Sequence, residues 1–502
     1  MGRPDMTPAD LDYADVQGLV RFGFGRLTQA SYALLRIRDA AAARAWLRAA
    51  PVTTAVTKEP PPTTAMQVAF SAEGLRALGV APAVLAAFAP DFLSGMTEPS
   101  RSRRLGDTGP NAPSQWEWGG PGGAPHVVVM LFAAAGGLDT LVRETTGAWK
   151  AAFEPIRWLG TGDLDAHEPF GFADGISQPQ IDWDQQRNPR RAQVAYGNVV
   201  ALGEFLLGYR NEYAKFTDRP LVSPDAASAG LPPALDAPEK RDVGRNGTYV
   251  VIRQLRQDVR GFWRFIYQQA NGDPAEAEKL AAAMVGRTRA GDPLVPADEE
   301  AIPGIGPEAR RNRFTYDGDP GGTRCPFGAH LRRANPRNGD YPGRPSRLKR
   351  LVTLVGFGPR GFRDDLMSSV RFHRILRRGR EFGPGLSTED ALAPAPPNEP
   401  ERGLHFICLN ANISRQFEFL QNAWLMSTKF SGLTGESDPL VGNRERIAGC
   451  PTTDEFVIPE ERGLCRRVSG LPQFVTVRGG EYFFLPGVRA LRYLAGGGSG
   501  PH

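Results

Sequence analysis

The chain has 502 residues, with 60 Lys or Arg and 55 Asp or Glu, so its formal net charge is +5. This excess is small for the length and is spread along the chain, which disfavours a nucleic-acid partner. Its share of hydrophobic residues, 41%, is ordinary for a globular protein, and a chain of this size can bury a large core in one or two domains without disulfides.

The N-terminal segment lacks the features of a signal peptide. It carries Pro4, Asp5, Pro8 and Asp10 where a signal peptide needs a basic start and an apolar run. No later segment has enough consecutive apolar residues to span a membrane. We therefore expect a cytoplasmic protein without a membrane partner.

The cysteines form neither a CxxC pair nor a regular spacing, which argues against a zinc site and against a disulfide framework. We expect reduced thiols. The four residues are Cys325, Cys408, Cys450 and Cys465.

Hydrophobic periodicity in the first third of the chain predicts alternating strands and helices. Strands are expected at residues 31–38, 66–70, 126–133 and 155–160, and helices at 39–50, 71–78 and 138–152. The order strand, helix, strand, strand, helix, strand is that of a split βαβ unit of the ferredoxin type.

Residues 91–125, rich in Gly, Pro, Ser and Arg, are expected to form a long irregular connection. Its Trp116 and Trp118 either pin this loop to the core or line a pocket.

The same pattern returns after a proline-rich connection that ends near residue 245. Strands are expected at 247–255, 371–378 and 404–409, helices at 257–270 and 413–426, and two final strands at 473–478 and 481–485 around a Gly479-Gly480 hairpin turn. The sequence therefore predicts an α+β fold of two ferredoxin-like units with antiparallel sheets, packed into one barrel-like body. The expected domains are residues 1–205 and 206–502.

One segment concentrates chemical groups that suit a metal site. Residues 324–337 read RCPFGAHLRRANPR, in which Pro326 and Pro336 stiffen the backbone around His330. Neutral imidazole is a frequent ligand of haem iron, and guanidinium groups match carboxylates such as haem propionates. A structural histidine, with arginines on a solvated face or at a phosphate site, is the alternative interpretation.

A second segment, residues 171–179, reads GFADGISQP. Together the two segments resemble the signature of the dye-decolourising peroxidases, a haem peroxidase family with a GxxDG motif and a downstream proximal histidine. The resemblance extends to residues 15–19, 403–421, 438–442 and 474–486, and so spans nearly the whole chain. It implies two ferredoxin-like halves with one haem b per chain held in the C-terminal half.

The resemblance implies catalytic roles for three residues. His330 would be the proximal iron ligand, and Asp174 would move a proton between the oxygens of hydrogen peroxide. Arg377 would be the distal cation, with Arg378 as the alternative because neighbouring strand residues point to opposite faces. From spacing alone, Asp174 could instead be a turn residue that bonds its own backbone.

Further residues are expected around the haem on the same basis. Glu418 is the candidate acceptor for the second N–H group of His330, with Asn412 as the alternative and a surface salt bridge as the ordinary role of such a Glu. Arg332 and Arg333 are adjacent, so only one could face the cofactor. The expected cofactor-binding residues are Gly171, Phe172, Gly175, Ile176, Ser177, Arg337 and Glu418.

The leading hypothesis is a haem peroxidase that uses hydrogen peroxide to oxidise bulky aromatic or dye-like donors. A haem-binding or haem-trafficking protein with incidental peroxidase activity is the first alternative. A binding module whose arginines face an anionic ligand is the second. His167, seven positions before Asp174, is a further candidate for the distal pocket.

Overall fold

The structure is a computed structural model, and it describes residues 11–496 except 122, 163–166, 187–198, 296–310, 313, 317, 338–369 and 447–451. Within this part of the chain, no helix has both the length and the apolar character needed to cross a membrane. Cys325, Cys408 and Cys465 are free thiols, as expected, whereas Cys450 lies outside the described residues.

The first unit has the ferredoxin-like order predicted from the sequence. Its elements are β1 (Gln29–Ile37), α1 (Ala40–Ala49), β2 (Thr64–Phe70), β3 (Val127–Ala133), α6 (Leu138–Trp149) and β4 (Phe153–Gly160). The strands lie in the order β2-β3-β1-β4, and all pairs are antiparallel. The Asp39 carboxylate starts α1 by accepting hydrogen bonds from the Ala41 and Ala42 N–H groups.

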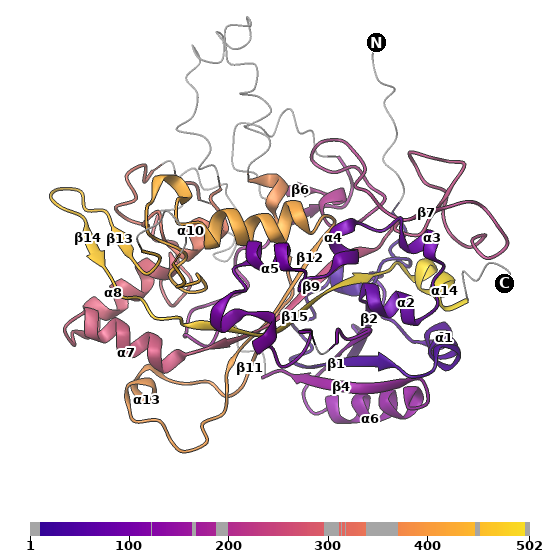
Figure 1. The fold of residues 1–502 in the computed structure, drawn as a ribbon, viewed down its shortest axis with the longest axis horizontal. Coiled ribbons are helices and arrows are strands. Elements are labelled where there is room, and N and C mark those ends of the chain that lie inside the picture. The colour runs from indigo at the N-terminus through magenta and orange to yellow at the C-terminus, as the bar shows by residue number, and fades with distance from the viewer. Residues whose placement is uncertain are drawn as a thin grey trace, which may run out of the picture.

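The second unit repeats this arrangement. Its elements are β9 (Thr248–Gln257), α7 (Val259–Gln269), β10 (Leu376–Arg377), β12 (Gly403–Asn410), the wide π-helical turns η7 (Ser414–Glu418) and η8 (Leu420–Met426), and β15 (Val475–Leu485). The strand order β10-β12-β9-β15 again places the second, third, first and fourth strands side by side. Figure 1 shows α7 and α8 (Pro274–Val285) beside this unit, and α1 and α6 beside the first.

The two units form one continuous sheet. Phe484 of β15 pairs with Phe70 of β2, and the path then runs from β10 to β4, with β11 (Arg380–Phe382) also pairing to β12. This confirms the α+β class with antiparallel strands. The path has two ends in the described residues, so the strands there form an open sheet rather than a closed barrel. The domain boundary at residues 205 and 206 stays a prediction.

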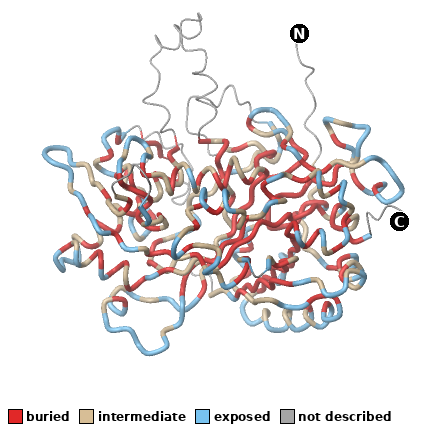
Figure 2. The backbone as a smooth tube through the Cα atoms, viewed as in Figure 1, coloured by how far each residue is buried: buried red, intermediate tan, exposed pale blue. Residues whose placement is uncertain are grey.

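Both faces of the sheet are covered. Every residue of β3 is buried, and alternate side chains enter different apolar clusters, Val127 and Val129 on one face and Val128 and Met130 on the other. Figure 2 shows the buried backbone running through the centre of the molecule. A strand covered on both faces reads as an unbroken apolar run, which is what its sequence shows.

The last strand corrects a prediction. Residues 475–485 form a single strand with a bulge between Val477 and Gly479, rather than two strands around a hairpin turn. A Cβ atom at Gly479 would lie 2.4 Å from Trp118 Nε1, so the glycine makes room for the Trp118 ring. This indole is buried and donates a 2.8 Å hydrogen bond to Gln254 Oε1. Trp118 therefore pins its loop to the sheet.

The connection expected to be irregular contains short helices. These include α4 (Pro90–Ser94) and α5 (Pro99–Leu105), and each begins with a proline at its first position. The strand expected at residues 371–378 instead begins with a 3₁₀ turn, η6 (Arg371–His373), and only β10 is a strand there.

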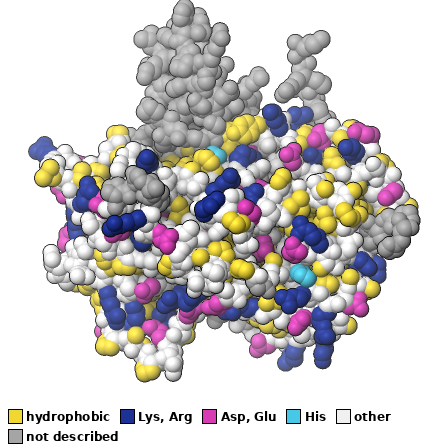
Figure 3. Space-filling view, in the orientation of Figure 1, with side chains coloured by type: hydrophobic (Ala, Val, Ile, Leu, Met, Phe, Trp, Pro, Cys, Tyr) yellow, Lys and Arg dark blue, Asp and Glu magenta, His cyan; other side chains and the backbone are white. Residues whose placement is uncertain are grey.

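The remaining elements are short connections around this frame. They are η1 (Gly18–Val20), α2 (Ala72–Ala77), α3 (Pro82–Leu85), η2 (Gly109–Asn111), η3 (Pro113–Gln115), β5 (Gln180–Asp182), β6 (Val199–Ala201), η5 (Leu202–Glu204), β7 (Leu221–Val222), β8 (Arg241–Asp242), α10 (His330–Ala334), α13 (Thr388–Leu392), η9 (Phe430–Gly432), β13 (Phe456–Ile458), β14 (Arg466–Val468) and α14 (Val488–Gly496). On the face shown in Figure 3, basic and acidic side chains are interspersed.

Candidate active site

A cavity of about 260 Å³ lies against the sheet of the second unit. Alternate residues of β9, Arg253, Leu255 and Gln257, form part of its floor, because side chains two apart on a strand share a face. Leu404 and Phe406 of β12 continue this wall. Three residues singled out from the sequence also line the cavity, namely Asp174, His330 and Arg377.

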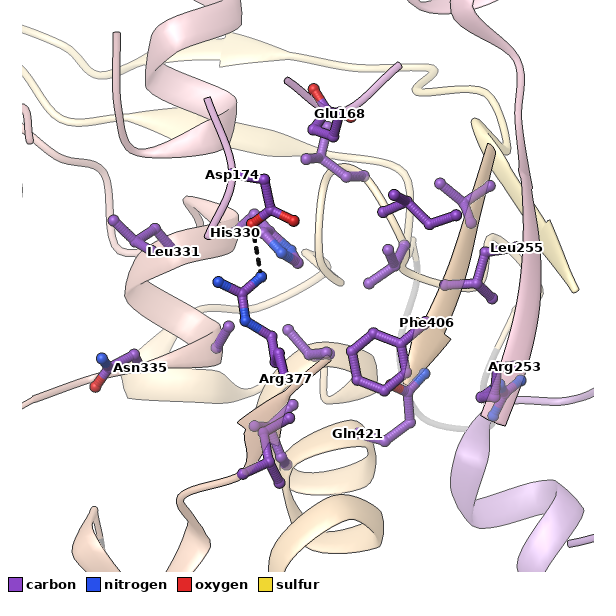
Figure 4. A pocket seen from close by; sticks show the side chains of 18 of the residues that line it. Glu168, Asp174, Arg253, Leu255, His330, Leu331, Asn335, Arg377, Phe406 and Gln421 are labelled. Atoms are coloured by element: carbon purple, nitrogen blue, oxygen red, sulfur yellow. Dashed lines mark hydrogen bonds and ion pairs between the residues drawn. The ribbon is translucent and has the colours of Figure 1, made fainter. Parts of the chain in front are cut away.

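Asp174 and Arg377 are in contact, as Figure 4 shows. Arg377 Nη1 donates to Asp174 Oδ1 over 2.9 Å, and both side chains are about one-third exposed or more, 33% and 41%, because they face the open space of the cavity. Gln178 fixes the two segments together, since its amide accepts from the Arg377 N–H over 3.1 Å and donates to the Arg377 carbonyl over 3.2 Å. The segment that carries Asp174 is thus joined to β10 by the Gln178 side chain, which bonds the Arg377 backbone, and by the bond between the Asp174 and Arg377 side chains.

The charge on Asp174 is stabilised. Burial opposes its ionisation, but the Arg377 guanidinium, the Gly175 N–H group and His330 outweigh that effect, so the pKa of Asp174 is lowered. The carboxylate is therefore ionised at neutral pH and is able to accept a proton.

Arg378 points away from the cavity. Its guanidinium donates to the Leu19 carbonyl over 2.8 Å and to the Val20 carbonyl over 3.0 Å. Burial lowers the pKa of Arg378 to about 10. Of the two adjacent arginines, Arg377 is the one that lines the cavity.

His330 is the first residue of α10, and its ring is held by Asp438. Nδ1 of His330 lies 2.9 Å from Asp438 Oδ2. The Asp438 side chain is fully buried, and its other oxygen accepts from the Leu440 and Val441 N–H groups over 2.9 Å each. A proton on Nδ1 leaves the Nε2 lone pair of His330 available as a ligand.

Burial and Asp438 shift the pKa of His330 in opposite directions. Burial disfavours the charged ring, but the Asp438 carboxylate attracts and bonds the proton, and the pKa of His330 is raised. Burial likewise opposes the charge on Asp438, yet His330 and neighbouring donors lower the pKa of Asp438. The pair therefore keeps a proton between Nδ1 and the carboxylate.

The expected partner of His330 was wrong. Glu418 is buried and accepts from Arg101 Nη1 at 2.7 and 2.8 Å and from the Tyr482 hydroxyl at 2.9 Å, without contacting His330. The alternative, Asn412, accepts from the Arg415 N–H through its side chain. The sequence signal that could have identified Asp438 is its position in DPLVG, where an aspartate can bond the following backbone N–H groups and so be held in place.

The arginines near His330 bond other groups of the protein and do not line the cavity. Arg337, which was expected at the cofactor, is 2% exposed and donates to the Asn312 and Phe314 carbonyls, and it is not among the residues that line the cavity. Arg332 bonds Asp319 over 3.0 Å. Arg333 is fully buried and donates to the carbonyls of Trp424 and Ser427.

Besides Arg253 and Arg377, two arginines that were not singled out in the sequence line the cavity. They are Arg287 and Arg374. Arg287 Nη2 donates to Ser177 Oγ over 2.9 Å. Burial and neighbouring arginines lower the pKa of Arg287 to about 10. Neither residue belongs to a recognisable motif, so only the packing of the chain reveals them.

Some residues of the GxxDG segment line the cavity, and others shape the backbone turn. Phe172, Ile176 and Ser177, which were expected to bind the cofactor, line the cavity. Gly171 and Gly175 do not, but both have positive φ angles, 95° and 77°, which glycine adopts without strain. These two glycines shape the turn that presents Asp174. His167 lies outside this cavity, in the wall of a neighbouring one.

No family model matches the chain. The chain is similar to the dye-decolorizing peroxidase msp1 of Mycetinis scorodonius, with 28% identity over 452 residues, 86% of this chain and 76% of the relative. A dye-decolorizing peroxidase of Auricularia auricula-judae is 28% identical over 513 residues, 97% of this chain and 87% of the relative. A multifunctional dye peroxidase of an Amycolatopsis strain is also 28% identical, over 453 residues, 85% of this chain and 81% of the relative.

Solved structures show the same fold. A dye-decolorizing peroxidase in complex with 2,6-dimethoxyphenol superposes with a TM-score of 0.70 at 23% identity, covering 97% of this chain and all of that one. The enzyme of an Anabaena species superposes with a TM-score of 0.66 at 23% identity, covering 96% and 94%. This chain is thus similar in sequence to dye-decolourising peroxidases, at 28% identity, and shares the fold of their solved structures.

Proposed function

We propose that this chain is a haem peroxidase that reduces hydrogen peroxide and oxidises bulky aromatic or dye-like donors. The observation that carries the proposal is that one cavity contains both a histidine held through Nδ1 and an Asp–Arg pair. Relatives at 28% identity that are named dye-decolorizing peroxidases support the same activity.

The residues of the cavity fit one haem b per chain. Phe172, Ile176, Leu331 and Phe406 provide apolar walls for a flat ring, and His330 offers one ring nitrogen as a ligand. Arg287 and Arg374, which also line the cavity, are suited to the carboxylates of such a cofactor. When bound, the haem would supply an iron that takes both oxidising equivalents of peroxide and passes them on singly.

The contact between His330 and Asp438 would tune the iron ligand. An anionic partner on Nδ1 fixes the tautomer and orientation of the ring and increases the basicity of Nε2. Because the Asp438 carboxylate is also held by two backbone N–H groups, it cannot easily turn away from the histidine.

Asp174 and Arg377 would carry the distal chemistry. Cleaving the O–O bond into water requires the proton of the inner oxygen to reach the outer one, so a base must accept it and return it. The ionised Asp174 carboxylate serves as that base. The Arg377 guanidinium stabilises the negative charge that develops on the departing oxygen and orients Asp174 through their 2.9 Å bond.

The test is an absorption spectrum of the purified protein after haem supplementation, followed by one equivalent of hydrogen peroxide. We expect a Soret band that shifts rapidly with peroxide. In His330→Ala, the band should be lost while the circular dichroism of the fold is retained. A Soret band indifferent to peroxide would contradict the peroxidase and indicate haem handling, and the absence of any band would contradict haem binding itself.

A further inference from the structure

A second cavity, of about 500 Å³, adjoins the cavity that contains Asp174, which is called the site cavity below. The two cavities share the lining residue Glu168, which precedes the GxxDG segment. Its other walls include His167, Gly171 and Glu381. Several of its lining residues are exposed, among them His167 and Gly383, so this outer cavity opens to solvent. Glu168 lines both cavities and therefore stands at the boundary between solvent and the space that contains Asp174.

The Glu168 carboxyl group is held at this boundary by three N–H donors. Oε2 accepts from the Phe170 N–H over 3.0 Å and from Gln257 Nε2 over 2.8 Å, and Oε1 accepts from the Phe172 N–H over 3.0 Å. Gln257 belongs to β9 and also lines the site cavity. Its own Oε1 is buried and has no hydrogen-bond partner among the described residues.

The charges around Glu168 differ from those around Asp174. No Lys or Arg of the described residues forms an ion pair with Glu168, whereas Asp174 is paired with Arg377. The other titratable or charged residues that line the inner cavity are Asp107, Asp174, His330, His373, Arg253, Arg287, Arg374 and Arg377, and those of the outer cavity are His167 and Glu381. Burial, and to a smaller extent the charge of Asp174, raise the pKa of Glu168 to about 7 against the lowering effect of its three N–H donors. One cavity is thus lined by two carboxyl groups whose pKa values are shifted in opposite directions, that of Glu168 upward and that of Asp174 downward.

The proposed reaction needs a proton path into this cavity. Its balance is one hydrogen peroxide and two donors AH, giving two waters and two donor radicals. The first water takes both protons of peroxide, and the second needs two protons and two electrons from the donors. A donor too bulky for the cavity releases its protons outside, so they must cross the protein boundary. Asp174, ionised and bonded to Arg377, is poorly suited to collecting them from neutral solvent.

We propose that Glu168 relays protons from the outer cavity to the site cavity during the steps that reduce the oxidised enzyme. Its carboxyl group takes a proton from the solvent side and releases it on the side of Asp174, and it is regenerated by the next proton from outside. This role rests on the proposed peroxidase function. Glu168 acts through the site's solvent and Asp174, so it is a positioning and relay residue rather than a contact of peroxide.

The experiment compares the full-length haem-supplemented protein with Glu168→Gln and Glu168→Asp. Glutamine keeps the size of the side chain and an oxygen that accepts backbone N–H bonds, but it does not titrate. Stopped-flow absorption separates the reaction with peroxide from the later reduction by a dye. In Glu168→Gln we expect an unchanged peroxide step, an unchanged Soret maximum and a reduction step slowed by about tenfold or more. Formic acid added to the buffer should restore the rate, and Glu168→Asp should be intermediate.

A readout without haem completes the test. In infrared difference spectra of the haem-free protein, we expect a protonated carboxyl band that disappears as the pH rises through about 7 and is missing in Glu168→Gln. A wild-type reduction rate in Glu168→Gln at every pH would overturn the relay while leaving the peroxidase function intact. A slowed peroxide step with a displaced Soret band, not restored by formic acid, would show a loop-shaping role and would overturn it too. A wild-type protein inert to peroxide would instead refute the proposed function.

Discussion

Nδ1 of His330 lies 2.9 Å from a carboxylate oxygen of Asp438, 108 positions further along the chain. The carboxylate is fully buried and is fixed by the backbone of the loop that follows it. Partners of this kind set the orientation and basicity of a metal-binding imidazole.

Asp438→Asn is therefore expected to weaken haem binding by about 10-fold to 100-fold, because an amide bonds the ring less strongly than a carboxylate. The measurement is a titration of the haem-free protein followed through the Soret band. Glu418→Gln is the matched comparison, since Glu418 is buried with Arg101 and Tyr482 and does not touch His330. It should lower the denaturation midpoint in urea but leave haem affinity in the folded protein unchanged. Equal losses of haem affinity in both variants would refute the assignment of Asp438.

Asp174→Asn is expected to slow the reaction with peroxide by about 100-fold to 10,000-fold, since the amide cannot accept the proton. Haem binding and the Soret maximum should persist. Stopped-flow absorption at the Soret band measures the rate. An unaltered rate would leave Arg377 as the main distal group.

The pH dependence of the peroxide step follows from the direction of the Asp174 shift. Its pKa is lowered, so the carboxylate stays ionised below the ordinary range of an aspartate and protonates only in stronger acid. The rate should thus be flat around neutral pH and fall as the pH drops through the lowered value. A decline that begins near pH 7 would contradict this sign, as would the same acid decline in Asp174→Asn.

Arg377 and Arg378 provide a test within one dipeptide. Arg377→Leu should slow the peroxide step by about 100-fold or more, because it removes the cation next to Asp174. Arg378→Leu should leave that step unchanged and instead lower stability, since it strips donors from the Leu19 and Val20 carbonyls. Peroxide kinetics and urea unfolding of both variants distinguish the two roles. The reverse pattern would exchange the assignments.

Gly479→Ala is expected to destabilise the protein by about 1–3 kcal/mol, because the new methyl group would meet the buried Trp118 ring 2.4 Å away. Gly147→Ala is the control, since this glycine lies inside α6 and an added Cβ meets nothing within 4 Å. The control should be neutral or stabilising by about 0.5–1 kcal/mol. Urea unfolding measures both. An unchanged stability in Gly479→Ala would contradict the role of Trp118 as a pin.

Local patterns in the sequence determined most of the elements. Strands such as β3 and helices such as α1 are encoded by periodicity and by caps within a few residues, as with Asp39. The repeated order of strands and helices was enough to predict two ferredoxin-like units. The GxxDG segment and the His330 segment were recognisable because each carries its chemistry within fewer than fifteen consecutive residues.

Tertiary structure decided what depends on partners far apart in the chain. Asp438 rather than Glu418 contacts His330. Arg337 donates hydrogen bonds to the carbonyls of Asn312 and Phe314 instead of lining the cavity. Gly479 continues a strand instead of turning it, because this stretch pairs with β9, and Trp118 packs against the glycine. The chemistry of a side chain determines which bonds it can make, but packing selects its partner among groups that local sequence patterns do not connect to it. That choice is a property of the folded chain as a whole.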